Sequence, residues 1–256
     1  VVVIGGGIMG QYHVMLAKRK GARVILSEVD PARAELAKKL GADIVFNPIE
    51  VDPVEFVKSV TEGRGADVVF NTTAIASDFV WEGAQCAAAL NAALPEGGNV
   101  VIINGGYESS TSTDRQKGFV EGLNDNFTIV AEQNANWLMA EAQDVMENII
   151  QAQGGENIDA VYAVTDDMIQ GAMNAITANG LVPGQDILTM GIDGTRAALE
   201  AVEAGTQLAS CTCTPYFGPI VVETITKLIN GEEVAPAIVN PDTLYTKDNV
   251  DVSVGF

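Results

Sequence analysis

The stretch VVVIGGGIMG (residues 1–10) decides how the first part of this chain folds. Its apolar start predicts a buried strand, and the glycines match the pattern G-x-G-x-x-G at a strand-to-helix turn. In this pattern Gly5 allows the tight turn, Gly7 lets the backbone approach a phosphate, and Gly10 lets the helix pack closely on the strand. Because the start of a helix offers free N–H groups to anions, the stretch predicts a dinucleotide-binding turn.

An acidic residue stands where such a turn needs one. Glu28 closes the second expected strand, residues 24–27, where a carboxylate accepts hydrogen bonds from both ribose hydroxyls of an adenosine. The same carboxylate repels a 2′-phosphate, so the pattern favours NAD over NADP, without requiring that a cofactor be bound. The alternative is that Glu28 only ends a strand at the protein surface.

Short apolar runs alternate with helical patterns along most of the chain, and such alternation predicts parallel sheets with helices on both faces. The expected strands are residues 1–4, 24–27, 44–47, 68–71, 100–104, 128–132, 160–164, 188–192 and 208–212. A last helix is expected at residues 218–230, with Gly231 as its C-cap. The remaining tail is expected to be irregular or short-stranded.

Composition limits the classes of function. Hydrophobic residues make up 47% of the 256-residue chain, which is enough for a sizeable core. The net charge of −20 argues against nucleic acid and anionic membranes as partners. No apolar run reaches the ~18 residues that a membrane span needs. With three Cys and one His, no zinc or other metal site is expected.

Charge is unevenly distributed along the chain. Residues 1–74 hold nine basic and nine acidic residues, whereas residues 75–256 hold five basic and 25 acidic ones. A step of this kind suggests that the two segments have different origins.

The first 74 residues resemble a known enzyme domain. Besides the glycine turn, the segments DPARAELAKKLGAD (residues 30–43) and GRGADVV (residues 63–69) resemble the coenzyme domain of zinc-dependent medium-chain alcohol and polyol dehydrogenases. That family's zinc-bearing barrel and its Cys, His and Glu ligands are not found in this sequence, so no catalytic residues and no dehydrogenase activity are expected. The resemblance implies a set of cofactor-binding residues, in which Arg33 lies at the adenine edge. They are Gly5, Gly7, Ile8, Met9, Gly10, Glu28 and Arg33.

From about residue 75 onward the chain resembles a different family. The segments IASDFVWEGAQCAAAL (residues 75–90), AVYAVTDDMIQGAMNAI (residues 160–176) and ILTMGIDGTRAALEAVEAGTQLASCT (residues 187–212) resemble periplasmic sugar-binding proteins of the ribose-binding type. A sugar ring needs an aromatic platform and paired polar groups. The resemblance implies that Asp193 accepts a sugar hydroxyl and that Trp137 stacks on the ring.

The expected sugar-binding residues are Thr113, Asp114, Arg115, Trp137, Thr165, Asp166, Asp193 and Thr214. They follow the expected strands, and the carboxyl ends of parallel strands share one edge of a sheet. Local alternatives stay open: the Asp residues cap helices, Trp137 lies in the core, and Arg115 is a structural residue of its helix.

These patterns together predict an α/β chain of two Rossmann-like lobes, joined by a hinge of crossing segments. A dinucleotide-binding-like N-lobe is expected from residues 1–76 plus 214–242, with strand order 3-2-1-4. A sugar-binding-protein-like C-lobe is expected from residues 77–213 plus 243–256. Each lobe is expected to hold a parallel sheet with helices on both faces.

The abrupt join, and a start inside a strand without Met, favour an engineered chimera cut from longer parents, one cytoplasmic and one periplasmic. We expect it to lack catalytic activity and to retain weak binding of NAD or adenosine and part of a sugar site. The expected partners are therefore small molecules, a nucleotide or a sugar, and the sequence does not settle the oligomeric state. One alternative is an NAD-dependent oxidoreductase acting on a polyol or sugar, although no general base is identifiable. The other is a periplasmic sugar-binding receptor, which would need a signal peptide and a first lobe of its own.

Overall fold

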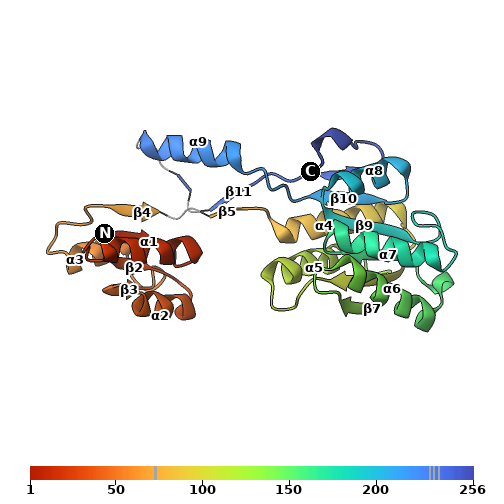
Figure 1. Cartoon of the computed structure of the whole chain (residues 1–256), viewed down its shortest axis with the longest axis horizontal. Coiled ribbons are helices and arrows are strands. Elements are labelled where there is room, and N and C mark those ends of the chain that lie inside the picture. Colours follow the sequence, from red (N-terminus) through yellow and green to blue (C-terminus); the bar gives the residue numbers. More distant parts are fainter. Residues whose placement is uncertain (72–73, 231, 233, 236) are drawn as a thin grey trace. The chain divides into compact units, whose positions relative to one another are not determined.

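Helices and strands alternate along the chain in the computed structural model, which describes residues 1–71, 74–230, 232, 234–235 and 237–256 (Figure 1). The chain divides into two units. Unit 1 comprises residues 1–76 and 221–238, and unit 2 comprises residues 77–220 and 239–256. Gly231, the expected cap of the last helix, lies outside the described residues.

The predicted lobe boundaries are wrong at the later crossings. Residues 214–220 and 239–242 belong to unit 2, whereas the prediction assigned them to the N-lobe. A hydrogen-bonded corner explains the second difference. Thr212 Oγ1 donates to Asp242 Oδ1 at 3.2 Å and accepts from the backbone N–H of Thr243 at 2.8 Å, so this segment is tied to unit 2.

Unit 1 holds a four-stranded parallel sheet in the predicted order β3-β2-β1-β4. Its strands are β1 (Val2–Ile4), β2 (Ile25–Ser27), β3 (Ile44–Phe46) and β4 (Val69–Asn71). Its helices are α1 (Ile8–Arg19), α2 (Pro31–Lys39), α3 (Pro53–Val60) and most of α9 (Gly218–Ile229). The starts of α2 and α3 are encoded locally, because Asp30 and Asp52 each cap a helix whose first residue is Pro.

Both faces of this sheet are covered because successive strand residues point to opposite sides. Val3 packs with Val14 of α1 and Ala37 of α2 on one face. Val2 packs with Phe46 and with Val57 of α3 on the other face. The apolar run at the start of the chain therefore serves two small cores.

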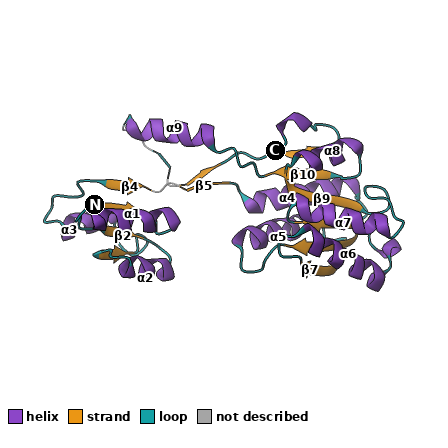
Figure 2. Ribbon diagram, in the orientation of Figure 1, coloured by secondary structure: helices purple, strands orange, loops and turns teal. Residues whose placement is uncertain are grey.

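Unit 2 holds a six-stranded sheet in the order β12-β10-β9-β8-β6-β7. Figure 2 shows strands of this unit lying between its helices. Its strands are β6 (Gly98–Asn104), β7 (Phe127–Asn134), β8 (Ala160–Ala163), β9 (Leu188–Asp193), β10 (Ala209–Thr212) and β12 (Leu244–Thr246). Five strands run parallel. The edge strand β12 is antiparallel to β10, which departs from the all-parallel prediction.

The helices of unit 2 cover both faces of its sheet. They are α4 (Phe79–Ala93), α5 (Ser110–Gly122), α6 (Met139–Gln153), α7 (Asp166–Ala178) and α8 (Arg196–Ala204), with short 3-10 turns at Gly155–Asn157 and Val252–Val254. Right-handed crossovers place α5 on one face and α6 to α8 on the other. In agreement, α4 packs on α5 and α6 packs on α7. The middle strands are completely buried, which explains their continuous apolar runs.

Two short strands lie in the crossing segments; the first was not predicted, and the second falls in the tail that was expected to be irregular or short-stranded. They are β5 (Ala74–Ala76) and β11 (Ala237–Val239), which pair in a two-stranded sheet. Within the described ranges, no helix combines the length and the apolar character that a membrane crossing requires.

Candidate functional site

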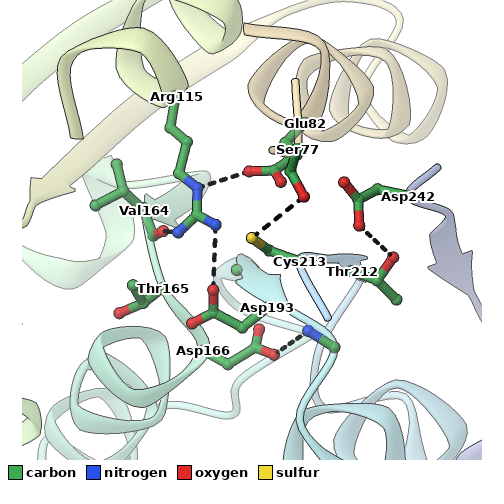
Figure 3. Close-up of polar contacts among 12 residues, drawn as sticks. Ser77, Glu82, Arg115, Val164, Thr165, Asp166, Asp193, Thr212, Cys213 and Asp242 are labelled. Carbon is green, nitrogen blue, oxygen red and sulfur yellow. Dashed lines mark hydrogen bonds and ion pairs between the residues drawn. The ribbon is translucent and has the colours of Figure 1, made fainter. Parts of the chain in front are cut away.

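Polar side chains converge at the carboxyl ends of β8, β9 and β10 in unit 2, around the guanidinium of Arg115 (Figure 3). Arg115 comes from α5, and its side chain is only 3% exposed. Its Nε donates to Glu82 Oε2 at 2.7 Å, Nη1 to the carbonyl of Val164 at 2.8 Å, and Nη2 to Asp193 Oδ1 at 3.2 Å. These bonds agree with the alternative that Arg115 is a structural residue of its helix, and its contact with a sugar stays a prediction.

Asp193 ends β9 and keeps 26% of its side chain exposed. It does not cap the next helix, because Thr195 holds that position and accepts a hydrogen bond from the N–H of Ala198. Its φ angle of 141° is unusual for a residue with a side chain, and such strain clusters at ligand sites. Burial raises the pKa of Asp193 to about 7, against the opposing effect of Arg115. Of the predicted acids, this is the one that is both anchored and accessible.

Asp166, by contrast, begins α7 and holds the loop after β9 in place. It is buried, and its Oδ2 accepts from the N–H groups of Gly194 and Thr195 at 2.8 and 2.9 Å. Ser210 adds a hydroxyl hydrogen bond at 2.9 Å. Burial raises the pKa of Asp166, and these donors oppose the rise. These bonds account for the position of Asp166 without a ligand, and its contact with a ligand stays a prediction.

The predicted threonines serve local structure. Thr165 caps α7 and accepts from the N–H of Met168. Thr214 accepts from the N–H of Tyr216 at 3.2 Å. Thr113 is exposed in the first turn of α5, where its hydroxyl donates to backbone carbonyls of that turn, and Asp114 is half-buried beside it. Each hydroxyl keeps capacity for a further hydrogen bond, so local use does not exclude ligand contact.

Trp137 is half-buried at the edge of the core of unit 2. Its ring lies against Gly105, directly after β6, where a Cβ atom would come within 2.4 Å of the indole. The glycine thus makes room for the ring. Both predicted roles, core packing and an exposed platform, are compatible with this position.

The cluster contains residues that sequence reasoning missed. Glu82 is completely buried and is the one charged residue of α4. A single charge in an otherwise uncharged helix is visible in the sequence and could have indicated a buried ion pair. Cys213 Sγ lies 3.6 Å from Ser77 Oγ. Buried oxygens of Glu82 (Oε1) and Asp242 (Oδ2) have no hydrogen-bond partner in the described part of the chain. Burial raises the pKa of Glu82 and that of Cys213, so both disfavour their charged forms.

The glycine turn of unit 1 has the backbone that its sequence predicts. Gly5 has a φ angle of 90°, and a Cβ on Gly10 would lie 1.8 Å from the carbonyl oxygen of Gly5. Gly7 precedes α1 without a side chain that could cap it, which leaves the first N–H groups of the helix available to an anion. Ile8 and Met9 at this end of α1 are exposed.

Glu28 is buried inside this turn and does not merely end a strand at the surface. Its Oε2 accepts from the N–H of Gly6, and its Oε1 accepts from the N–H of Asp30 at 2.8 Å. Gln11, which sequence reasoning missed, donates to the carbonyls of Gly6 at 2.8 Å and of Arg33 at 3.0 Å. The Arg33 side chain itself is exposed. Among the described residues, no group of three or more His, Cys, Asp or Glu side chains is arranged to hold a metal ion.

Residues 64–233 match the family described as periplasmic binding protein domain. The chain belongs to this family. Residues 9–115 also match the zinc-binding dehydrogenase family, so the two matches overlap between residues 64 and 115. This periplasmic binding protein therefore carries a dehydrogenase-like segment at its N-terminal end, in agreement with the two resemblances found in the sequence.

Similar proteins agree with both the periplasmic binding protein match and the dehydrogenase match. The galactofuranose-binding protein YtfQ of Escherichia coli K12 is 41% identical over 125 residues, which cover 47% of this chain and 39% of that protein. The ribose import binding protein RbsB of Bacillus subtilis is 28% identical over 248 residues, covering 90% of this chain and 79% of that protein. An L-threonine 3-dehydrogenase of Thermococcus kodakarensis is 47% identical over 68 residues, which cover 26% of this chain and 19% of the enzyme.

Solved structures share the two-unit fold. A galactofuranose-binding protein aligns with a TM-score of 0.64 and 26% identity, covering 96% of this chain and 94% of its own. The arabinose transporter's binding protein from Shewanella sp. ANA-3 aligns with a TM-score of 0.65 and 24% identity, covering 96% of this chain and 92% of its own. Proteins that align over most of the chain are thus named as binding proteins, in line with the expectation of a protein without catalytic activity.

Proposed function

We propose that unit 2 binds a monosaccharide or a related polyol at the carboxyl edge of its sheet, as part of a sugar-binding receptor. The observation that carries the proposal is the state of Asp193, which is held by Arg115 on one oxygen and is still 26% exposed at the end of β9. The names of similar proteins, which specify galactofuranose, ribose and xylitol binding, support this class of ligand.

The geometry suits a hydroxylated ring. An ionised carboxylate accepts hydrogen bonds from two neighbouring hydroxyls, and such charge-assisted bonds are stronger than neutral ones. Arg115 fixes the orientation of Asp193 from beneath, while the half-buried Trp137 offers an apolar face on which a ring stacks. Because the contacts assigned here come from one unit alone, we expect weak affinity, roughly in the millimolar range.

Calorimetric titration of the whole chain with D-ribose, L-arabinose, D-allose, D-fructose and xylitol tests the proposal. At least one sugar should bind, and Asp193→Asn and Trp137→Ala should each weaken it about tenfold or more, equivalent to ~1.4 kcal/mol. Asp144→Asn, a substitution of an exposed acid on α6, is the matched control and should leave binding unchanged. Absence of binding heat with every sugar would reject the proposal.

The glycine turn supports a second, independent proposal, weak NAD or adenosine binding by unit 1. The observation that favours it is the contact between the Gly10 position and the Gly5 carbonyl, which leaves no room for a side chain. The N–H groups at the start of α1 would hold the pyrophosphate, Glu28 the ribose hydroxyls, and Arg33 the adenine edge. NAD supplies a hydride acceptor when bound, but we assign no base or metal that would use it.

Titration with NAD and with AMP tests this second proposal. Binding of both, weakened by Glu28→Gln and by Gly10→Ala, is the expected result. Since Glu28 already accepts two backbone hydrogen bonds, the ribose must use its remaining lone pairs, and we expect the affinity to be low. Equal binding by the wild type and Glu28→Gln would show that the nucleotide lies elsewhere.

We also propose that the two segments were joined by engineering from a cytoplasmic dehydrogenase and a periplasmic receptor. The charge step near residue 74 and the two family matches support this origin. A natural gene that encodes both segments in this order would contradict it.

A further inference from the structure

Two carboxylates share one guanidinium at the base of the proposed sugar site. Arg115 Nε donates to Glu82 at 2.7 Å, and Nη2 of the same group donates to Asp193 at 3.2 Å. The three side chains come from α4, α5 and the end of β9. Glu82 is completely buried, and its bond to Arg115 is the shorter of the two, so whenever Glu82 is ionised its charge acts on Arg115 without screening by water.

The other groups that face these two carboxyl groups are acids, and of them Cys213 is neutral, because burial raises its pKa to about 11. Asp193 faces Arg115 from α5, Glu82 from α4, Asp166 from α7 and Cys213 after β10. Glu82 faces Arg115, Cys213 and Asp242, the last of these just before β12. One guanidinium therefore balances at most one of several buried acids. Burial raises the pKa of Asp193 to about 7 against the effect of Arg115, and Asp166 and Glu82 act in the same direction as burial.

We propose that Glu82 is a positioning residue that competes with Asp193 for Arg115 and thereby sets the lowest pH at which the site binds its sugar. The inference rests on the proposed function, since it concerns the same site. Asp193 accepts sugar hydroxyls on both oxygens only as a carboxylate. While Glu82 is ionised and bound to Arg115, it weakens the hold of Arg115 on the Asp193 charge and repels that charge directly, so Asp193 is protonated at a higher pH.

Glu82→Gln separates this role from a merely structural one. The amide oxygen still accepts the hydrogen bond from Arg115 Nε, so the geometry is kept while one negative charge is lost. Sugar affinity measured by calorimetry across neutral and acidic pH should keep its alkaline plateau within about threefold. The acid midpoint should move down by about one pH unit. Glu121→Gln, an exposed substitution on α5, is the matched control and should leave the midpoint where it is.

A measurement without sugar keeps this inference separate from the proposed function. The carboxyl 13C resonance of Asp193, titrated in the ligand-free protein, should move to a lower midpoint in Glu82→Gln. Coupling between two titrating groups is reciprocal, so in Asp193→Asn the Glu82 resonance should shift down by a comparable amount. If circular dichroism shows that Glu82→Gln does not fold, the titration of Glu82 in Asp193→Asn tests the coupling instead.

Failure of sugar to bind at any pH would reject the proposed function, and the titration without sugar would still test the coupling. Unchanged midpoints in the variants that fold would overturn the role of Glu82. So would an upward shift of the Asp193 midpoint in Glu82→Gln.

Discussion

The two units place their candidate sites at equivalent positions, the carboxyl ends of parallel strands, but build them from different chemical groups. In unit 1 the site is backbone: the turn at Gly5 and the free N–H groups at the start of α1. In unit 2 it consists of titratable side chains, with Arg115 held between Glu82 and Asp193. A backbone site is therefore contiguous in sequence, whereas a side-chain site draws on residues that lie far apart in the chain.

Removal of the central charge of unit 2 should have the largest effect. Arg115→Met leaves the buried Glu82 carboxylate without its partner, which should cost about 3–5 kcal/mol of unfolding free energy. Arg64→Met in unit 1, where the ion pair with Asp67 is exposed, should change stability by less than about 0.5 kcal/mol. Urea unfolding followed by circular dichroism measures both.

Tryptophan fluorescence assigns the loss in Arg115→Met to a unit, because both tryptophans of the chain, Trp81 and Trp137, belong to unit 2. Equal losses in the Arg115 and Arg64 variants would contradict the contrast between a buried and an exposed pair.

The backbone site should be broken by a single methyl group. In Gly10→Ala the new Cβ would meet the Gly5 carbonyl at 1.8 Å, and the overpacking should cost about 1–3 kcal/mol. Gly7→Ala places its Cβ in open space, so it should cost less than about 1 kcal/mol, through the poorer helix cap alone. Far-UV circular dichroism during urea unfolding compares the two. A Gly10→Ala variant as stable as the wild type would show that the close turn is not required.

The stability of the two units should depend on pH with opposite signs. Folding raises the pKa of Asp193 to about 7. The contribution of this group to the free energy of unfolding is therefore complete below the unfolded pKa and is lost as pH rises through 7. Each unit of pKa shift corresponds to about 1.4 kcal/mol. Lys18 and the N–H of Val24 lower the pKa of Asp43 in unit 1, so that contribution is lost only as pH falls below 3.8.

Urea unfolding of unit 2, followed by tryptophan fluorescence between mildly acidic and alkaline pH, measures this dependence. Asp193→Asn should flatten it, and an unchanged slope in that variant would assign the dependence to other groups.

A similarly small effect should come from the ion pair between Lys18 and Asp43 in unit 1. Lys18→Met removes the contact with Asp43 at 2.8 Å, and both side chains are about one third exposed. The expected loss is about 0–1 kcal/mol, and it should shrink in high salt. A loss comparable to that of Arg115→Met would remove the distinction between the two units.

Features built from local patterns were predicted from the sequence, whereas features that depend on long-range contacts were not. The fold class, the order β3-β2-β1-β4 and the strand that leads to Asp193 were predicted, because apolar strands and glycine turns are local patterns. The strand β5 was missed, and β11 and β12 lie in the tail that was expected to be irregular or short-stranded without being placed there, because none of the three has the flanking glycine turn and helix that mark β1. The later crossing points were misplaced, because one long-range contact between Thr212 and Asp242 assigns that segment.

The candidate site was predicted only in part, for a physical reason. A carboxylate after a strand has the same sequence pattern whether its side chain stays partly exposed, as that of Asp193 does, or accepts backbone N–H groups, as that of Asp166 does. The hydroxyls of Thr165 and Thr214 are equally ambiguous, since caps and turns use the same groups. Glu82 was within reach of sequence reasoning, because an isolated charge in an apolar helix must find a partner.

The emission of Trp137 tests most directly whether ligand reaches the carboxyl edge of unit 2. Trp81→Phe leaves Trp137 as the single tryptophan, beside Gly105 at the end of β6. We expect that a sugar that binds changes this emission, and that the change disappears when the Asp193→Asn substitution is combined with Trp81→Phe. An emission that no sugar alters, or a response that survives the loss of the Asp193 carboxylate, would contradict the assignment of the site.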